Sequence, residues 1–462
     1  MFNEIQTWAR GISGTAGQLN EDLHAAFNVL GVAAGQIGER AIAYTGAPTA
    51  SVAWQLLRAM GGGGGAPLRF ASTTNFIDLS TTTHASAGTQ LTYFSRQPVL
   101  IGSGNFASLR VSFSGNKGAG DNAFTITKVA LERKTPNVTV PMTFSGARSK
   151  VINPLDVDIQ TDQILPSAFG LSEFTRGSEY WIRFQITVTT AGHFLPLSQI
   201  IFNTSQRTTD QWGLRYDPAT FTQSDVDSTG TAFSGTGFAF ADGVLAHACL
   251  LGTPSGALLP VVAGIGDSIV TGTGDSFAAT ALLNTGFFNR ALVDLTDFRS
   301  NPFAACNFSR SGTQASLFNG QPIGAYMLRY CSHIVEEYGA NGDTGQTTLW
   351  STLAGVGKPI IRTKLMARTT STDAWATTAN QTYFDANWTP PSGQRVIFNQ
   401  TLDSKFANGD FSALIDFQPD VLDAVDRWKW KGGGAMTSDG LHPNAAAHAL
   451  MAARLRAYLL TL

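Results

Sequence analysis

The chain has 462 residues, with 43% hydrophobic and 14% charged residues and a formal net charge of −2 at pH 7. This length predicts two or three domains with ordinary cores. The near-neutral charge, without a cluster of Lys and Arg, argues against a nucleic-acid partner. No stretch approaches about 18 consecutive apolar residues, so no transmembrane helix is expected.

The first 60 residues are predicted to be helical, because apolar residues such as Trp8, Ile12 and Leu19 recur mainly at steps of three and four. Such an apolar stripe must be covered, and three partners stay open: the next domain, copies of this segment in a homo-oligomer, or a larger assembly. Five glycines from Gly61 to Gly65 mark a flexible hinge at 61–67. They are no phosphate loop, because no Gly-Lys-Ser/Thr follows them.

The start of the chain also bears on localisation. It has neither a basic segment nor a continuous apolar segment, so a conventional secretory signal is not expected. The compartment stays open, and an extracellular or virion-associated protein is compatible with the composition.

From residue 68 to 252 apolar and polar side chains alternate. Between Glu179 and Val188 the even positions are apolar and most odd ones polar, which predicts a half-buried antiparallel strand. Several such strands without helical stretches predict an all-β sandwich of the jelly-roll type. Exposed aromatics such as Trp212 and Tyr216 would suit carbohydrate binding, with ordinary packing as the other interpretation. The further expected strands are 109–113, 123–131, 138–144, 200–203 and 245–250.

From residue 258 to 462 short apolar strands alternate with helical pieces. This alternation predicts an α/β domain with a parallel sheet covered on both faces. The chain as a whole is therefore predicted to be multidomain: helical segment, hinge, sandwich and α/β domain. The expected strands are 261–265, 305–308, 333–336, 360–366 and 395–398, and the expected helices include 277–283 and 445–460.

The three cysteines, Cys249, Cys306 and Cys331, leave one thiol unpaired under any disulfide scheme. Cys306 and Cys331 lie in apolar runs that we interpret as core strands, so the thiols are expected to be small buried hydrophobes. Their spacing fits no zinc site, and neither a metal nor an organic cofactor is predicted.

A serine lies just after the first predicted strand of the α/β domain. Ser268 comes after 261–265 and Gly266-Asp267, which places its hydroxyl at the carboxyl edge of the sheet, where ligands of α/β folds bind. A serine there can act as a nucleophile if a base is within reach. Asp439 and His442 lie three residues apart before the closing helix, a spacing that can set the carboxylate against one imidazole nitrogen.

These two segments resemble the GDSL (SGNH) hydrolase family. The first matches as Gly266-Asp267-Ser268 and the second as Asp439-x-x-His442 followed by Pro443. The resemblance covers residues 258–462 and implies a three-layer α/β fold and a Ser268–His442–Asp439 triad. It also implies an oxyanion hole made by Ser268, Gly312 and Asn341. Ile269 replaces the family's leucine, and Gly342 interrupts the family's Gly-x-Asn-Asp.

Two other residues compete for catalytic roles. A second Gly-Asp-Ser ends at Ser276, but no apolar strand precedes it, so Ser276 is expected to cap a helix. His448 lies inside the alanine-rich closing helix and is expected to be an ordinary helix residue. Trp428 and Trp430 precede the Asp-His pair and are equally compatible with a ligand site and with the core.

The favoured hypothesis is a serine esterase that deacetylates an O-acetylated polysaccharide. The alternative is a virion, tail or cell-surface glycan-binding protein in which the hydrolase domain is accessory or inactive. A complete set of Ser, His and Asp argues against an inactive domain. The low charge, the many Gly, Thr and Asn residues and the lack of an expected secretory signal favour the alternative.

Overall fold

The computed structural model describes residues 67–77, 79, 84–85, 92–115, 122–190, 194–195, 213–215, 226–227, 248–276, 285–433 and 436–462. The helical segment expected at 1–60, the strand at 200–203, Trp212, Tyr216 and the helix at 277–283 lie outside these residues. Residues 68–462 belong to one compact unit.

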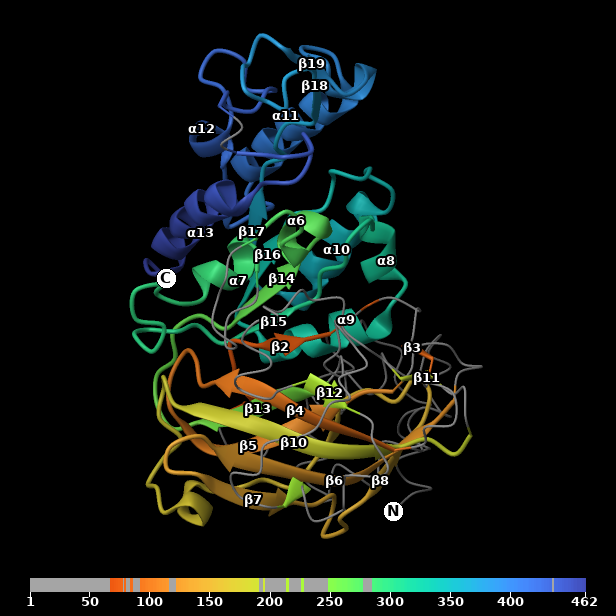
Figure 1. Cartoon of the computed structure of the whole chain (residues 1–462), viewed down its shortest axis with the longest axis vertical. Coiled ribbons are helices and arrows are strands. Elements are labelled where there is room, and N and C mark those ends of the chain that lie inside the picture. Colours follow the sequence, from red (N-terminus) through yellow and green to blue (C-terminus); the bar gives the residue numbers. More distant parts are fainter. Residues whose placement is uncertain are drawn as a thin grey trace, which may run out of the picture. The chain divides into compact units, whose positions relative to one another are not determined.

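Two antiparallel sheets form the first part of this unit (Figure 1). One has the order β1-β13-β5-β9 and the other β12-β4-β10-β6-β7, with β8 paired to β6. Both contribute to one apolar core, for example Val111 and Leu250 from the first sheet and Leu131 and Ile182 from the second. The strands are β1 (Arg69–Phe70), β4 (Thr92–Leu100), β5 (Phe106–Phe113), β6 (Phe124–Arg133), β7 (Val138–Met142), β8 (Lys150–Ile152), β9 (Ile159–Gln160), β10 (Glu179–Thr187), β12 (Gly213–Arg215) and β13 (Cys249–Pro254).

The expectation that β10 is half-buried is wrong. All its residues except Thr187 are buried. On its polar face Arg183, fully buried, pairs with Glu132 at 3.1 Å, and the Arg96 guanidinium lies 4.2 Å from the Trp181 ring centroid. Buried charges are stable only when paired, so alternation along β10 reflects a polar buried layer and not a solvent face.

A six-stranded sheet forms the second part, in the order β2-β15-β14-β16-β17-β20, and every pair in it is parallel. Neighbouring residues of β14 point to different cores: Ala263 and Ile265 enter one apolar cluster and Val262 another. Both faces of the sheet are therefore buried, as expected of parallel strands. The strands are β2 (Asn75–Phe76), β14 (Val262–Ile265), β15 (Ala305–Asn307), β16 (His333–Glu336), β17 (Ile360–Thr363) and β20 (Ala413–Ile415).

Helices lie on both faces of this sheet (Figure 1). Residues of α8, α9 and α10 belong to the cluster of Ala263, and residues of α7 and α13 to the cluster of Val262. The closing helix expected at 445–460 is confirmed as α13 (Ala445–Leu459), which starts where the Asn444 side chain accepts two backbone N–H groups. The other helices are α6 (Ser268–Thr271), α7 (Phe287–Ala291), α8 (Ala315–Asn319), α9 (Pro322–Met327), α10 (Gln346–Val356), α11 (Gln394–Ala407) and α12 (Gln418–Val421).

Two local expectations are wrong. Residues 395–398 belong to helix α11 and not to a strand, because the buried residues Arg395, Asn399 and Leu402 recur at helical spacing. Cys331 lies just after a 3₁₀ helix (Leu328–Tyr330) and not in a strand, although it is buried and free, as are Cys249 and Cys306.

Strand β2 comes from a stretch that the sequence places in the sandwich, yet it pairs with β15 in the parallel sheet. A two-residue strand carries too little pattern to be recognised, and its partners are more than 200 positions away. The division into residues 68–252 and 258–462 stays a prediction.

Candidate active site

The turn after β14 presents Ser268. Gly266 and Asp267 follow the strand, and Ser268 is the first residue of α6. The Asp267 side chain accepts the backbone N–H of Ile269 at 3.1 Å, which caps this short helix. Ser268 is 5% exposed, so its hydroxyl stands in a fixed, nearly enclosed position at the carboxyl edge of the sheet.

His442 brings Ser268 and Asp439 together. Its Nε2 lies 2.9 Å from Ser268 Oγ, and its Nδ1 lies 2.6 Å from Asp439 Oδ2. An ionised carboxylate only accepts, so Nδ1–H donates to Asp439 and Nε2 accepts the serine hydroxyl. The three residues that the sequence proposes for catalysis thus form one hydrogen-bonded chain across 174 positions of sequence.

The loop that carries Asp439 and His442 is built to hold this pair. Asp439 Oδ1 accepts the backbone N–H groups of Leu441 at 2.9 Å and His442 at 2.7 Å. Gly440 has φ +78°, and a Cβ there would lie 1.9 Å from the carbonyl oxygen of Thr369, so no other residue fits. The Thr437 hydroxyl donates to the His442 carbonyl at 2.8 Å and closes the turn.

The electrostatics of Asp439 suit an orienting carboxylate. Partial burial tends to raise its pKa, but the hydrogen bonds from the His442 ring and from the backbone of His442 and Leu441 outweigh this effect. The pKa of Asp439 therefore lies well below its ordinary value, and the group stays ionised at neutral pH.

The two further residues proposed for the oxyanion hole lie on neighbouring loops. Gly312 is exposed with φ +75°, and the space around its α-carbon is open. The amide of Asn341 donates to Asp267 Oδ2 at 3.1 Å and to the carbonyl of Thr313 at 3.2 Å. Both hydrogens of this amide thus have protein acceptors, and an oxyanion would have to share or replace one of them.

Sequence reasoning missed a buried carboxyl pair beneath Ser268. Asp267 is fully buried and Glu337, just after β16, is 3% exposed. Burial raises the pKa of Asp267 to about 6. Burial, together with the charge of Asp267, raises the pKa of Glu337 well above its ordinary value. The signal available in the sequence was the position of Glu337 at the carboxyl end of a predicted core strand.

The second Gly-Asp-Ser has a structural use. The side chain of Asp275 accepts the backbone N–H of Gly286 at 2.8 Å and pairs with Arg290 at 3.2 Å, while Ser276 is exposed. A Cβ on Gly274 would lie 2.5 Å from the Pro443 carbonyl oxygen. This tripeptide therefore packs against the loop that carries His442.

His448 lies in α13, as expected, and is fully buried. Its Nδ1 accepts the backbone N–H of Phe287 at 3.0 Å, and its Nε2 lies 3.2 Å from the carbonyl oxygen of Thr273. Burial lowers the pKa of His448 to about 4, so the ring is neutral at pH 7. It positions the backbone behind the site and does not take part in the triad.

The tryptophans before the histidine loop belong to the core. Trp430 is fully buried and donates its indole N–H to the carbonyl of Gly440 at 2.9 Å. Trp428 is 9% exposed and packs edge-on against Trp388. Of the two interpretations left open by the sequence, the structure favours core packing.

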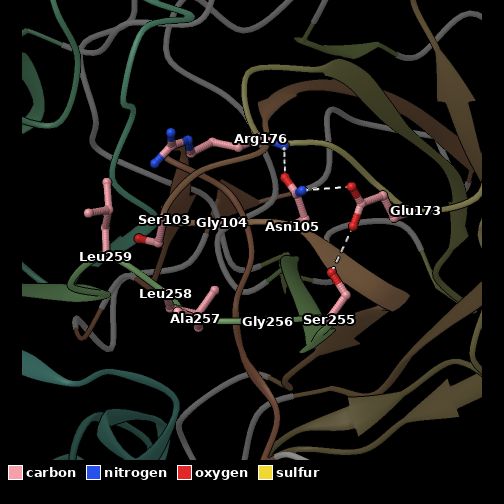
Figure 2. A pocket seen from close by; sticks show the side chains of 10 residues that line it. All are labelled: Ser103, Gly104, Asn105, Glu173, Arg176, Ser255, Gly256, Ala257, Leu258 and Leu259. Carbon is pink, nitrogen blue, oxygen red and sulfur yellow. Dashed lines mark hydrogen bonds between the residues drawn. The ribbon is translucent and has the colours of Figure 1, made fainter.

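A cavity of about 500 Å³ lies elsewhere, where the antiparallel and parallel parts meet (Figure 2). Ser103 in its wall donates to the carbonyl of Pro260, just before β14, whereas Ser268 follows the opposite end of that strand. Figure 2 shows the Asn105 side chain between Glu173 and the backbone of Arg176. This cavity is therefore separate from Ser268. Its lining is Ser103, Gly104, Asn105, Glu173, Arg176, Ser255, Gly256, Ala257, Leu258 and Leu259.

Several solved structures are similar to about 44% of this chain. They include a GDSL-like lipase from Bacteroides thetaiotaomicron, with 13% identity, a TM-score of 0.28, and coverage of 44% of this chain and 88% of the lipase. They also include the acetylxylan esterase Axe2 from Geobacillus stearothermophilus, with 16% identity, a TM-score of 0.31, and coverage of 43% and 94%.

Part of this chain is similar to GDSL-type esterases. No protein-family model matches the chain, and no curated protein matches its sequence. At these identities and TM-scores the likeness carries no conclusion about chemistry, which rests on the geometry of the site.

Among the described residues, no helix is long and apolar enough to cross a membrane. In the same part of the chain, no three His, Cys, Asp or Glu side chains are grouped as metal ligands would be.

Proposed function

We propose that the protein is a serine hydrolase of carboxylic esters. The observation that carries this proposal is the chain of two hydrogen bonds from Ser268 Oγ to His442 Nε2, 2.9 Å, and from His442 Nδ1 to Asp439 Oδ2, 2.6 Å. Nucleophile, base and orienting carboxylate are the three groups that acyl transfer by a serine requires.

In the proposed reaction Ser268 Oγ attacks the ester carbonyl while His442 takes its proton. Asp439 stabilises the imidazolium that forms. As the tetrahedral intermediate collapses, the imidazolium gives this proton to the leaving alcohol, and an acyl-serine remains. Water, deprotonated by His442, then attacks the acyl-serine and releases the acid, and Ser268 regains its proton.

The developing oxyanion needs donors, and we propose the backbone N–H groups of Ser268 and Gly312 with the side chain of Asn341. Ser268 contributes from the first turn of α6, whose N–H groups have no partner within the helix. The Asn341 amide donates to the carbonyl of Thr313, the residue after Gly312. This bond holds Asn341 next to Gly312 and supports a shared role of the two. Removal of one such donor typically costs about 100- to 1000-fold in kcat.

The finer architecture is also a proposal. Residues 258–462, with β2, would form a three-layer hydrolase domain of the GDSL/SGNH type, and residues 68–252 a jelly-roll-like β-sandwich. The two sheets that share one apolar core support the sandwich. The parallel sheet with helices on both faces supports the hydrolase domain.

Within the ester hydrolases we propose an O-acetylated polysaccharide as the substrate. Support comes from the two antiparallel sheets in the same compact unit as the triad, an architecture that often binds glycans. Release of acetate from acetylated xylan, compared with release of p-nitrophenol from acetyl and octanoyl esters, tests this choice. A preference for the octanoyl ester with no acetate from glycans would contradict it.

Hydrolysis of p-nitrophenyl acetate by the wild type, Ser268→Ala and Ser276→Ala tests the activity itself. Ser268→Ala is expected to lose about 10³-fold or more in kcat, since it removes the nucleophile. Ser276→Ala is the matched control at the second Gly-Asp-Ser and is expected to keep wild-type turnover. A wild type no faster than buffer, or an active Ser268→Ala, would contradict the proposal.

A further inference from the structure

The two buried carboxyl groups beneath Ser268 touch each other. Glu337 Oε2 accepts the backbone N–H of Asp267 at 3.4 Å, and the two carboxyl groups lie within reach of a hydrogen bond to each other. A Cβ on Gly266 would lie 2.8 Å from Glu337 Oε2 and 2.4 Å from Val270 Cγ2. Both side chains therefore meet inside the turn that presents the nucleophile.

Two carboxylates in contact and out of water cannot both be ionised at low cost, so one proton is shared between them. Burial raises the pKa of both groups, and the negative charge of Asp267 further raises the pKa of Glu337. Asp267 accepts N–H groups from Ile269 and Asn341 through its two oxygens, as an ionised carboxylate does, so the proton belongs to Glu337, which donates to Asp267.

Both carboxylate oxygens of Asp267 also accept a donor on the side of the active site. Oδ1 accepts the N–H of Ile269 at 3.1 Å, next to Ser268, and Oδ2 accepts the amide of Asn341 at 3.1 Å. One carboxylate therefore connects the nucleophile turn with a proposed oxyanion donor. Its orientation depends on the group that holds it from behind, which is Glu337.

We propose that Glu337 is a positioning residue for the ester hydrolysis proposed above, and that it acts as a protonated donor to Asp267. With the proton on Glu337, the pair carries one negative charge, and Asp267 fixes the positions of Ser268 and Asn341 relative to each other. Without it, a second negative charge would stand close to the developing oxyanion, and Asp267 would lose a hydrogen bond. The expected effect on kcat rests on the proposed esterase activity, whereas the protonated pair itself does not.

The charged groups around the pair are the ones a pH experiment must consider. Arg362 acts on both carboxyl groups and favours their ionised forms, and His442 acts on Asp267 in the same direction. Arg362 forms an ion pair with Glu336, with a distance of 2.9 Å between Arg362 Nε and Glu336 Oε2. Tyr338, next along the chain, is buried and has its own pKa raised chiefly by burial.

Glu337→Gln and Glu337→Met separate a donor from a mere space-filler. Gln keeps an N–H donor of the same length and cannot ionise, whereas Met keeps the length without any donor. On p-nitrophenyl acetate at pH 7, Glu337→Met is expected to lose about ten- to a hundredfold in kcat at unchanged KM, because buried Asp267 loses its donor. Glu337→Gln is expected to restore about tenfold of this loss.

Glu173→Gln, the same chemical change in the distant cavity of Figure 2, is the control and is expected to leave kcat unchanged. If Glu337→Gln is as slow as Glu337→Met, a donor at this position does not restore kcat. This result would overturn the inference that Glu337 acts as a protonated donor. A rise in KM with constant kcat in Glu337→Met would also overturn it.

Stability measurements test the proton without any hydrolysis. A native carboxyl with a raised pKa stabilises fully below the unfolded value of about 4.3 and loses this contribution as pH rises toward its native pKa. Urea unfolding from pH 4.5 to 8 is therefore expected to show Glu337→Gln gaining stability relative to the wild type as pH rises. Parallel curves would overturn the inference. An inactive wild type with diverging curves would refute the esterase and leave the protonated pair established.

Discussion

The side chains of Ser268, His442 and Asp439 are carried by backbone turns that have stabilising hydrogen bonds of their own. The turn after β14 is capped by Asp267, and the histidine loop is closed by Thr437 and by the backbone N–H groups that Asp439 accepts. Preorganised groups of this kind need little rearrangement during reaction, which is the condition for efficient acyl transfer.

Asp439→Asn tests the orienting role of the carboxylate. An amide in its place can present an N–H to Nδ1, which would favour the tautomer with the proton on Nε2, the wrong one for a base. We expect kcat for p-nitrophenyl acetate to fall by about 10³- to 10⁴-fold with the fold intact. Circular dichroism checks the fold. A fall of less than about tenfold would contradict the orienting role.

His448 predicts a pH effect on stability. Its native pKa of about 4 lies below the unfolded value of about 6.5, so the unfolded state binds a proton first as pH falls. Stability from this residue is complete above the unfolded pKa and declines down to the native one, by up to about 1.4 kcal/mol per pH unit. His448→Asn, whose side-chain oxygen can still accept the Phe287 N–H, is expected to lack this decline.

Urea unfolding of the wild type and His448→Asn between pH 4 and 7 makes the comparison. The free energies of unfolding should converge as pH falls. A constant difference between the two proteins across this range would show that His448 is not held neutral.

At the scale of elements, short connections place the triad. The second Gly-Asp-Ser turn lies against the histidine loop, where a Cβ on Gly274 would meet the Pro443 carbonyl at 2.5 Å and His442 Cβ at 3.1 Å. α6, with four residues, and α7, with five, are too short to be stable alone, so packing and capping determine them.

Gly274→Ala is expected to push the histidine loop away from Ser268 and to lower kcat by about tenfold or more, since small misplacements of a catalytic base are costly. Gly409→Ala is the matched control, with φ +82° against +89° for Gly274 and nothing within 4 Å of its Cβ position. Both variants carry similar backbone strain of about 1 kcal/mol. Equal kcat in the two would contradict the contact between the turns.

At the scale of the whole molecule, the antiparallel and parallel parts share structure. Strand β2 completes the parallel sheet, and Asp158, 2% exposed, accepts Arg329 Nη2 at 2.6 Å and the Tyr330 hydroxyl at 2.7 Å. Asp158 precedes β9, while Arg329 and Tyr330 precede β16. A buried carboxylate with partners from both parts ties their stabilities together.

Asp158→Ala is expected to lower the free energy of unfolding by about 3 kcal/mol, because Arg329 and Tyr330 lose a buried acceptor. Asp162→Ala is the control, since the partners of the Asp162 carboxylate among the described residues, Thr143, Ser145 and Gly146, belong to the antiparallel part. Its effect should stay near 1 kcal/mol. Urea unfolding followed by tryptophan fluorescence measures both, and equal losses would contradict a special role of Asp158.

Features that depend on neighbouring residues along the chain could be predicted from the sequence. The strand before Ser268, the three-residue step from Asp439 to His442 and the closing helix after Asn444 are local patterns. The structure places Ser268 within hydrogen-bond distance of His442, and His442 within hydrogen-bond distance of Asp439. Turns, caps and short buried strands are governed by the residues that form them.

Features that depend on residues far away in the sequence became visible in the folded chain alone. It assigned β2 to the parallel sheet, made the polar face of β10 a buried ion-pair layer, and turned residues 395–398 into part of a helix. It also brought Glu337 against Asp267. In each case the deciding energy is burial or pairing with residues far away in sequence, which a local pattern does not contain.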